Sequence, residues 1–161
     1  MLSGDPGAFA IWCDPVESWS KERFKNGCFG YFLENEFFYS SVSTLGVDLN
    51  LLNVVDSMKG SVEDERLFSA AVVDVYRELC ERAFPSIDSD AEKSDFKHLV
   101  SVGSLLDDGH NVFLVEWEDQ ARIIYGRNED VESVMDVVLD REKFQSVVRE
   151  ATKKYKDLPH S

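Results

Sequence analysis

Nucleophilic chemistry in this chain would have to come from its few thiol and imidazole side chains. These are Cys13, Cys28, Cys80, His98, His110 and His160. A Cys–His pair needs only to be close in space, so geometry and not presence identifies one. No local pattern brings a cysteine and a histidine together, and we predict no catalytic residues. A small Cys/His enzyme stays open as a lesser alternative, which a structure without such a pair would exclude.

Metal and phosphate chemistry have equally little support in the sequence. There is no CxxC and no closely spaced histidine pair, as metal sites usually require. Glu116, Glu118 and Asp119 could hold a hard cation, but such a group is more commonly a solvated strand end and turn. Gly4-Asp5-Pro6-Gly7 lacks the lysine of a phosphate-binding loop and precedes an expected strand instead of following one. We therefore predict no metal and no cofactor.

Charge is the most unusual property of the chain. Its 161 residues include 31 acidic and 17 basic side chains, for a net charge of −14. Residues 86–140 alone carry 14 acidic and 4 basic residues, a net charge of −10. Such a surface repels nucleic acid and anionic lipid and attracts a cationic partner. The alternative is that the acidity serves solubility alone.

The same features indicate where the protein works. The first residues lack the basic start and long apolar run of a signal peptide, and no apolar run approaches the roughly 20 residues that span a bilayer. An odd number of cysteines at long spacings indicates reduced, mostly buried thiols. We expect a cytoplasmic protein that binds neither nucleic acid nor membrane.

Length and hydrophobic periodicity predict a single α+β domain over residues 1–161, an antiparallel sheet built from hairpins with two or three packed helices. A hairpin with strands at residues 28–33 and 37–40 and a turn at 34–36 is expected. Both of its faces carry aromatic residues, so either both faces are covered by other elements or one face is an exposed apolar surface. The other expected strands are residues 8–13, 112–117, 122–125 and 134–139.

Three helices are expected from capping residues and spacing. One runs over residues 48–58 with Asp48 as N-cap, and a longer one runs over 61–84 with Ser61 as N-cap. The last helix begins after Asp140 and is amphipathic. Its apolar stripe is Phe144, Val147, Val148, Ala151 and Tyr155.

The second hairpin is expected to turn at Asp119-Gln120. That turn places Trp117 opposite Arg122, whose guanidinium could lie over the indole, and Leu114 opposite Tyr125. One face then mixes Glu116 and Glu118 with Leu114, Ile123 and Tyr125. The apolar members either form a protein interface or pack under a helix, while the acids stay exposed in both cases.

These patterns favour a surface for a basic protein partner. The expected partner-binding residues are Asp107, Asp108, Glu116, Glu118, Asp119, Tyr125, Glu129, Asp130 and Glu132.

Four segments of the sequence resemble the immunity protein 42 family. They are Gly4-Asp5-Pro6 followed by Phe9-Ala10-Ile11; Phe24-Lys25-Asn26-Gly27; Ser43-Thr44-Leu45-Gly46-Val47-Asp48-Leu49; and Asp107-Asp108-Gly109-His110-Asn111-Val112-Phe113-Leu114-Val115-Glu116.

The resemblance implies a cytosolic immunity protein of a polymorphic toxin or contact-dependent growth inhibition system. Such proteins bind and neutralise the C-terminal domain of a cognate toxin, here expected to be a cationic nuclease. The family implies no catalytic residues and gives no contact set to transfer to this chain. An adaptor or chaperone for another protein is the main alternative, and the oligomeric state stays open.

Overall fold

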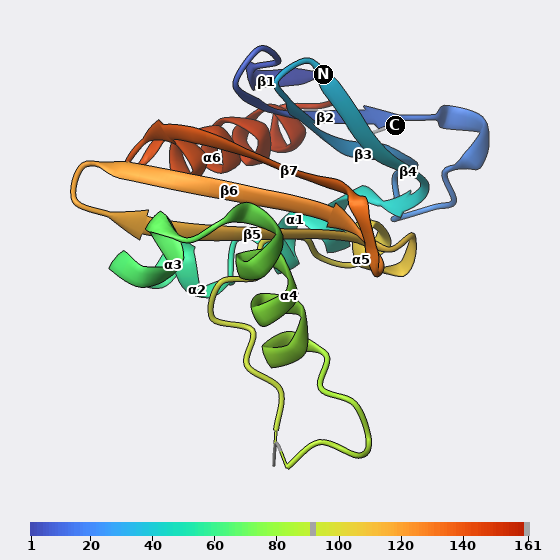
Figure 1. The fold of residues 1–161 in the computed structure, drawn as a ribbon. Helices are drawn as coiled ribbons and strands as arrows, with labels where there is room; N and C mark the ends of the chain where they lie inside the picture. The colour runs from blue at the N-terminus through green and yellow to red at the C-terminus, as the bar shows by residue number, and fades with distance from the viewer. Residues whose placement is uncertain (91–92, 160–161) are drawn as a thin grey trace.

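The computed structural model describes residues 1–90 and 93–159, so His160 lies outside the described residues. Seven strands form two antiparallel sheets in this part of the chain (Figure 1). The four-stranded sheet has the order β1-β2-β3-β4, and the three-stranded sheet has the order β5-β6-β7. The strands are β1 (Leu2–Asp5), β2 (Phe9–Pro15), β3 (Asn26–Leu33), β4 (Glu36–Thr44), β5 (His110–Trp117), β6 (Gln120–Arg127) and β7 (Asp130–Asp140).

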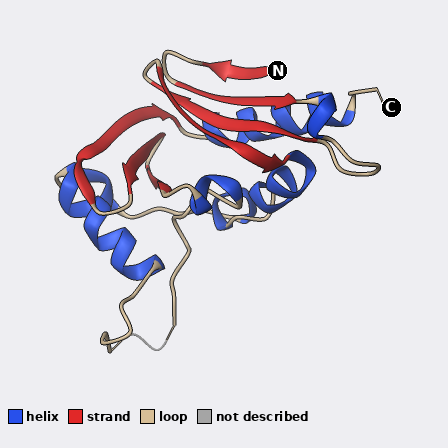
Figure 2. Ribbon diagram, turned by 90° about the vertical axis from the view of Figure 1, so that its right-hand side faces the viewer, coloured by secondary structure: helices blue, strands red, loops and turns tan. Residues whose placement is uncertain are grey.

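The helices lie between and beside these sheets (Figure 2). They are the 3-10 turn η1 (Glu17–Trp19) and the helices α1 (Leu45–Leu52), α2 (Asp56–Lys59), α3 (Glu65–Ser69), α4 (Val72–Ala83), α5 (Ser104–Asp107) and α6 (Lys143–Lys156). The predicted α+β class, with hairpins and a C-terminal helix packed on the sheets, is confirmed.

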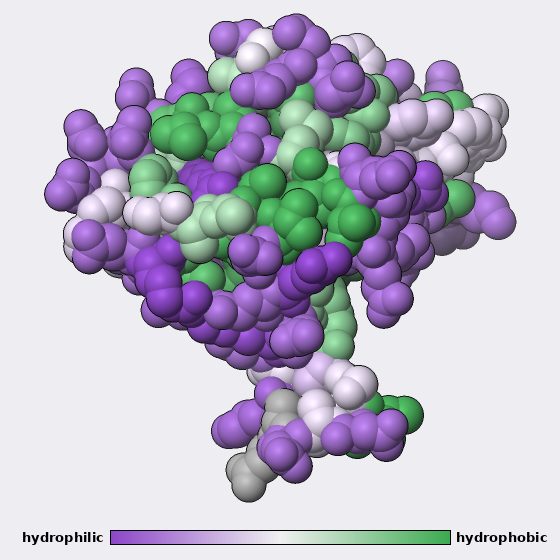
Figure 3. Space-filling view, viewed as in Figure 1, coloured by the Kyte–Doolittle hydropathy of each residue, from purple (hydrophilic) through white to green (hydrophobic). Residues whose placement is uncertain are grey.

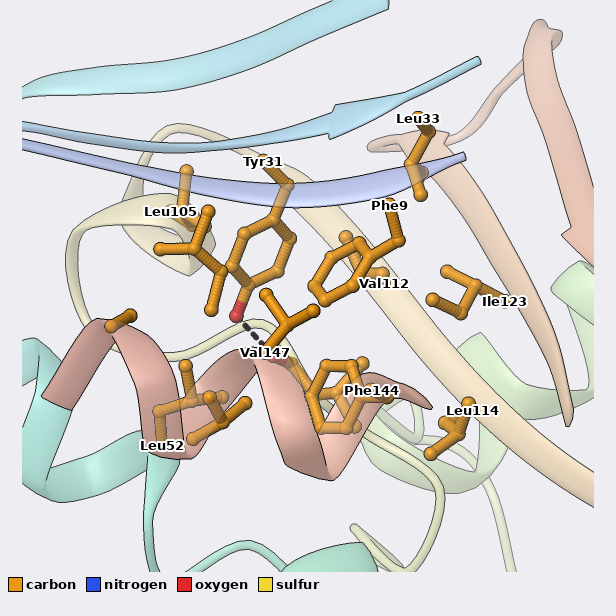
Figure 4. Packing of buried hydrophobic residues seen from close by; sticks show 14 of the residues in the cluster. Phe9, Tyr31, Leu33, Leu52, Leu105, Val112, Leu114, Ile123, Phe144 and Val147 are labelled. Carbon is orange, nitrogen blue, oxygen red and sulfur yellow. Dashed lines mark hydrogen bonds between the residues drawn. The ribbon is translucent and has the colours of Figure 1, made fainter. Parts of the chain in front are cut away.

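The larger core lies between the two sheets. It joins Phe9 and Tyr31 of the four-stranded sheet to Leu114 and Ile123 of the three-stranded sheet and to Phe144 of α6. These side chains point toward one another in Figure 4, where the Tyr31 hydroxyl donates a 2.7 Å hydrogen bond to the Val100 carbonyl. The buried hydroxyl thus has a partner, as a polar group in an apolar core requires.

A second core lies on the opposite face of the three-stranded sheet. Phe113, Val115 and Ile124 pack there against Leu67 of α3 and Leu79 of α4. The sheet is therefore covered on both faces, which explains why β5 is apolar on both sides where a half-exposed strand would alternate.

The first hairpin is confirmed, but its turn is one residue shorter than the predicted 34–36, because Glu36 already pairs with Leu33. Glu34 and Asn35 have φ of 48° and 69°, the left-handed pair that a tight two-residue hairpin turn needs. Aromatic side chains lie exposed on the outward face of this hairpin. There Phe37 stacks between Phe32 and Tyr39, with ring centroids 4.4 and 5.0 Å away, and Tyr39 is 51% exposed.

The prediction of one helix over residues 48–58 is wrong. The helix starts earlier than predicted, and the segment forms two short helices instead of one. Helix α1 begins at Leu45 and ends at Leu52, and α2 is a separate turn. Asp48 is not an N-cap. Its carboxylate is buried and accepts hydrogen bonds from the hydroxyls of Ser43 and Ser104, both at 2.5 Å. Gly103 leaves room for it, because a Cβ there would lie 1.9 Å from an Asp48 oxygen.

The helix expected over residues 61–84 is broken in two. Asp64, not Ser61, caps α3 by accepting a hydrogen bond from the Leu67 N–H, and Ala70 is extended with ψ of 162°. The break is held by Arg122, whose Nη1 donates to the carbonyls of Leu67, Phe68 and Ala70 at 3.2, 3.1 and 2.7 Å. These are carbonyls that a continuous helix would have used internally.

The second hairpin was assigned the right faces and the wrong register. The strands meet with Trp117 opposite Gln120 and Val115 opposite Arg122, so the turn is Glu118-Asp119. The predicted pairing is displaced by two residues, which keeps each side chain on its expected face because strand periodicity is two. Arg122 therefore does not lie opposite Trp117, and it forms a 2.7 Å ion pair with Asp136 instead.

The C-terminal helix follows its predicted stripe. Phe144, Val147, Val148 and Ala151 are buried against the larger core, and Tyr155 packs against it while partly exposed. Asp140 is not the N-cap: that position belongs to Glu142, which has a left-handed φ of 73°.

Candidate functional site

The predicted partner-binding residues do not form one surface. Asp107, Asp108, Glu129, Asp130 and Glu132 gather at the end of the three-stranded sheet where β5 begins and β6 turns into β7. The other predicted residues lie elsewhere on the sheet: Glu118 and Asp119 form the exposed turn at its far end. An eight-residue strand separates the two ends by about 24 Å.

A wide groove opens at the first of these ends. It has a volume of about 1320 Å³. One wall is α4 together with the residues that directly follow it, and the facing wall is α5 together with the β6–β7 turn. In Figure 3 the molecule narrows between the main body and the projecting segment below α4, and the groove lies beside this neck. Lining residues include Tyr76, Arg77, Glu81, Phe84, Leu106, Asp107, Asn111, Asn128, Glu129 and Val131.

The floor of the groove is fixed by Tyr76. Its hydroxyl donates a 2.5 Å hydrogen bond to the Asn128 carbonyl and accepts one from Asn111 Nδ2 at 3.2 Å. Its ring covers Gly126, where a Cβ would come within 2.2 Å of the ring. Burial raises the pKa of Tyr76, so the phenol stays protonated and uncharged. This contact ties α4 to the β6–β7 turn and holds the two walls together.

Carboxylates dominate the uncompensated charge of the groove. Glu78 is already neutralised by Arg66 and Arg82, at 2.7 and 2.8 Å, and the hydrogen bond from Arg66 lowers the pKa of Glu78. No ion pair within the described part of the chain involves the three remaining lining acids or Arg77. Those acids are Glu81, Asp107 and Glu129.

Further acids and apolar side chains surround the groove. Asp108, Asp130 and Glu132 extend the negative rim, and the Asp130 carboxylate holds the turn by accepting from the Glu132 N–H at 3.1 Å. Phe84 and Ile87 are exposed, the latter fully. An apolar lining inside a charged rim is the composition expected of a protein-binding surface.

Glu116 lies beneath the surface and not on it. The expectation that it is exposed is wrong: it is 1% exposed, and its carboxylate accepts hydrogen bonds from the Val62 N–H at 2.9 Å and from Gln145 Nε2 at 3.3 Å. Arg141 Nε lies 3.6 Å from the same carboxylate. Glu116 thus joins β5 to α6 and to the segment before α3.

Tyr125 is also buried, but it packs against the four-stranded sheet, whereas the packing alternative expected it under a helix. Its ring stacks on Phe38 of the four-stranded sheet with centroids 3.5 Å apart, and its hydroxyl lies 3.0 Å from His110 Nδ1. Burial raises the pKa of Tyr125 to about 12. It is 3% exposed and belongs to the core between the two sheets, so it is not available to a partner in this structure.

The described residues hold no constellation for catalysis. His98 Nδ1 bonds to the Leu114 carbonyl at 2.8 Å and His110 Nδ1 to the Tyr125 hydroxyl at 3.0 Å, and no hydrogen bond between a histidine and a cysteine occurs among the described residues. Burial raises the pKa of the Cys13 thiol to about 12, far from a reactive thiolate. No group of three potential metal ligands occurs in residues 1–90 and 93–159.

Two of the residues expected to bind a partner, Asp107 and Glu129, line this groove. Arg77 and Glu81 were not among the expected residues, although helical spacing places both on the polar face of α4. The groove itself was missed, because it forms between segments that are far apart in the chain.

Comparison with known proteins finds one related family and one related crystal structure. A family model described as Immunity protein 42 matches residues 1–154. A crystal structure of CdiI from Burkholderia dolosa AUO158 matches with a TM-score of 0.92 and 55% sequence identity, over 96% of this chain and 99% of that one. None of the curated proteins compared with the chain matches it. None of the described helices is both long and apolar enough to span a membrane.

Proposed function

We propose that this chain, which belongs to the immunity protein 42 family, neutralises its cognate toxin domain by direct binding in the cytoplasm. It is a non-enzymatic immunity protein of the contact-dependent growth inhibition type. The family match over residues 1–154 carries this conclusion. The groove supports it, because it offers a protein partner a concave surface that combines carboxylates with apolar side chains.

The charge distribution supports a cationic toxin, and we infer that the toxin is a nuclease. An enzyme that binds nucleic acid needs a basic surface, and the net charge of −10 over residues 86–140 is its complement. The acids at both ends of the three-stranded sheet then accelerate the encounter. These acids are Asp107, Asp108, Glu118, Asp119, Glu129, Asp130 and Glu132.

A test of this function needs the gene immediately upstream. We expect it to encode a large exported protein with a variable C-terminal domain. Expression of that domain alone should stop growth, and co-expression of this chain should restore it. The two proteins should co-elute on a sizing column, and the isolated toxin domain should cleave nucleic acid.

Two results separate the parts of the proposal. Growth that this chain does not restore, with no complex on the column, contradicts neutralisation by direct binding. A toxin domain that is neutralised but cleaves no nucleic acid contradicts only the nuclease assignment. A partner unrelated to any toxin, found beside the gene, favours the adaptor or chaperone alternative.

A further inference from the structure

We propose that the groove between α4 and the β6–β7 turn is the anchoring site for a projecting basic segment of the toxin, a helix or loop with several Lys or Arg side chains. This inference rests on the proposed function and adds to it the position of the anchor and the chemistry of the segment that fills it.

The shape of the groove determines what kind of element can enter. At about 1320 Å³ it exceeds the roughly 300–1,000 Å³ of small-molecule sites, and it is open to solvent. The hydrogen bond from the Tyr76 hydroxyl to the Asn128 carbonyl ties α4 to the β6–β7 turn, so the groove does not depend on the partner for its form. A preformed concave surface of this size fits one convex element of another protein.

The lining determines the chemistry of that element. Glu81 on α4 and Asp107 with Glu129 on the facing wall leave carboxylates on both sides of the opening, none neutralised by an ion pair among the described residues. Leu106 and Val131 provide apolar surface between them. Lys and Arg match both features, because their aliphatic stems pack on apolar surface while their charged ends reach carboxylates.

The groove also differs from the other acidic surfaces of the chain. Glu118 and Asp119 lie in an exposed turn and do not line this groove, so we expect them to attract a basic partner without holding it. At the groove, charge, apolar surface and concavity coincide. Anchoring residues cluster where a partner side chain loses its contact with water, and charges at an open edge mainly change the association rate.

A charge-reversal pair tests the position of the anchor. The groove variant carries Glu81→Lys, Asp107→Lys and Glu129→Lys, and the control carries Glu17→Lys, Glu34→Lys and Glu36→Lys. All six residues are exposed, and both variants change the net charge equally. With the purified toxin domain encoded upstream, the groove variant should bind roughly 100-fold more weakly or worse, mainly through faster dissociation. The control should be affected mainly in its association rate.

A cross-link tests the chemistry of the segment. Benzoylphenylalanine in place of Phe84, at the groove, should capture one toxin peptide after Glu-C digestion, and that peptide should contain at least two Lys or Arg residues. The same group in place of Trp19, which is exposed on η1, should not capture that peptide.

The possible results distinguish this inference from the proposed function. If the parent chain does not bind the toxin domain, both are contradicted. If the parent binds and the groove and control variants lose affinity equally, binding stands and the groove is not the anchor. A Phe84 cross-link to an acidic peptide overturns the basic segment. If the groove variant has a lower melting temperature than the parent, it is replaced by a variant with Asp107→Asn and Glu129→Gln. Undiminished affinity of that second variant for the toxin domain also contradicts the anchoring site.

Discussion

The Glu116 carboxylate accepts a 2.9 Å hydrogen bond from the backbone N–H of Val62, and this contact fixes a segment 54 residues away in the chain onto the edge of β5. The Val62 carbonyl accepts from the Glu116 N–H at 3.1 Å, and the Asp64 N–H bonds to the Glu116 carbonyl at 3.0 Å. Residues 62–64 thus cover an edge that would otherwise expose unpaired backbone groups.

Replacing Glu116 by Gln should destabilise the fold by about 1–3 kcal/mol. The NH₂ group of the new glutamine would face Gln145 Nε2 or the Arg141 guanidinium. Both of these groups are donors, so no hydrogen bond could form there. Glu118→Gln makes the same chemical change at an exposed turn and should stay within about 0.5 kcal/mol of the parent. Urea unfolding of both variants gives the comparison, and equal stabilities would contradict a structural role for Glu116.

Arg122→Met should destabilise the fold by about 3–5 kcal/mol. The change leaves Asp136 without its ion pair and removes the donor to three carbonyls at the break between α3 and α4. Arg127→Met removes an exposed guanidinium from the same strand and serves as the control. Thermal unfolding measures both, and a small loss for Arg122→Met would show that the break is held by packing alone.

Val148→Asp should unfold the domain or cost on the order of several kcal/mol, because it buries an unpaired charge in the larger core. Ser146→Asp adds the same charge to the exposed face of α6 and should leave the melting temperature nearly unchanged. A normal melting temperature for Val148→Asp would make α6 peripheral to the fold.

Stability should fall as pH drops below about 6.5. Burial lowers the pKa of His98 and of His110 below the ordinary value of 6.5. Between the folded and unfolded pKa values the unfolded chain binds more protons, so the free energy of unfolding rises with pH in that window. His98→Asn keeps a donor for the Leu114 carbonyl and should flatten the dependence. Melting temperatures from pH 5 to pH 8 test this, and equal slopes would exclude His98 as a source.

Association with the toxin domain should slow as salt increases, since the Debye length falls from about 30 Å at 0.01 M to about 10 Å at 0.1 M. Neutralising Glu118 and Asp119 together should reduce this dependence and slow association while leaving the dissociation rate unchanged. Glu116 is left intact, because its burial would confuse a binding effect with a folding effect. Stopped-flow association across a salt series is the measurement. A salt-independent parent rate would make the acidity a solubility feature.

Local sequence patterns were sufficient to predict features that depend only on residues close together in the chain. The apolar spacing from Phe144 to Tyr155 fixes which face of α6 is buried, and Asn35 marks the first hairpin turn. The assignment of β5 and β6 side chains to the two faces stayed correct despite a two-residue error in register, because side-chain direction repeats every two residues. The family was likewise recognisable from short segments, since a resemblance of sequence needs no coordinates.

Tertiary structure decided every feature that depends on a distant partner. Sequence alone could not show that Glu116 is buried, because Val62 and Gln145 make that possible from 54 and 29 residues away. The helix expected over residues 61–84 is interrupted where Arg122 binds its carbonyl groups. Arg122 lies on β6, more than 50 residues downstream. The groove follows the same rule: α4 and the β6–β7 turn face each other only after the chain has folded, and composition carries no information about which charges end up on the same wall.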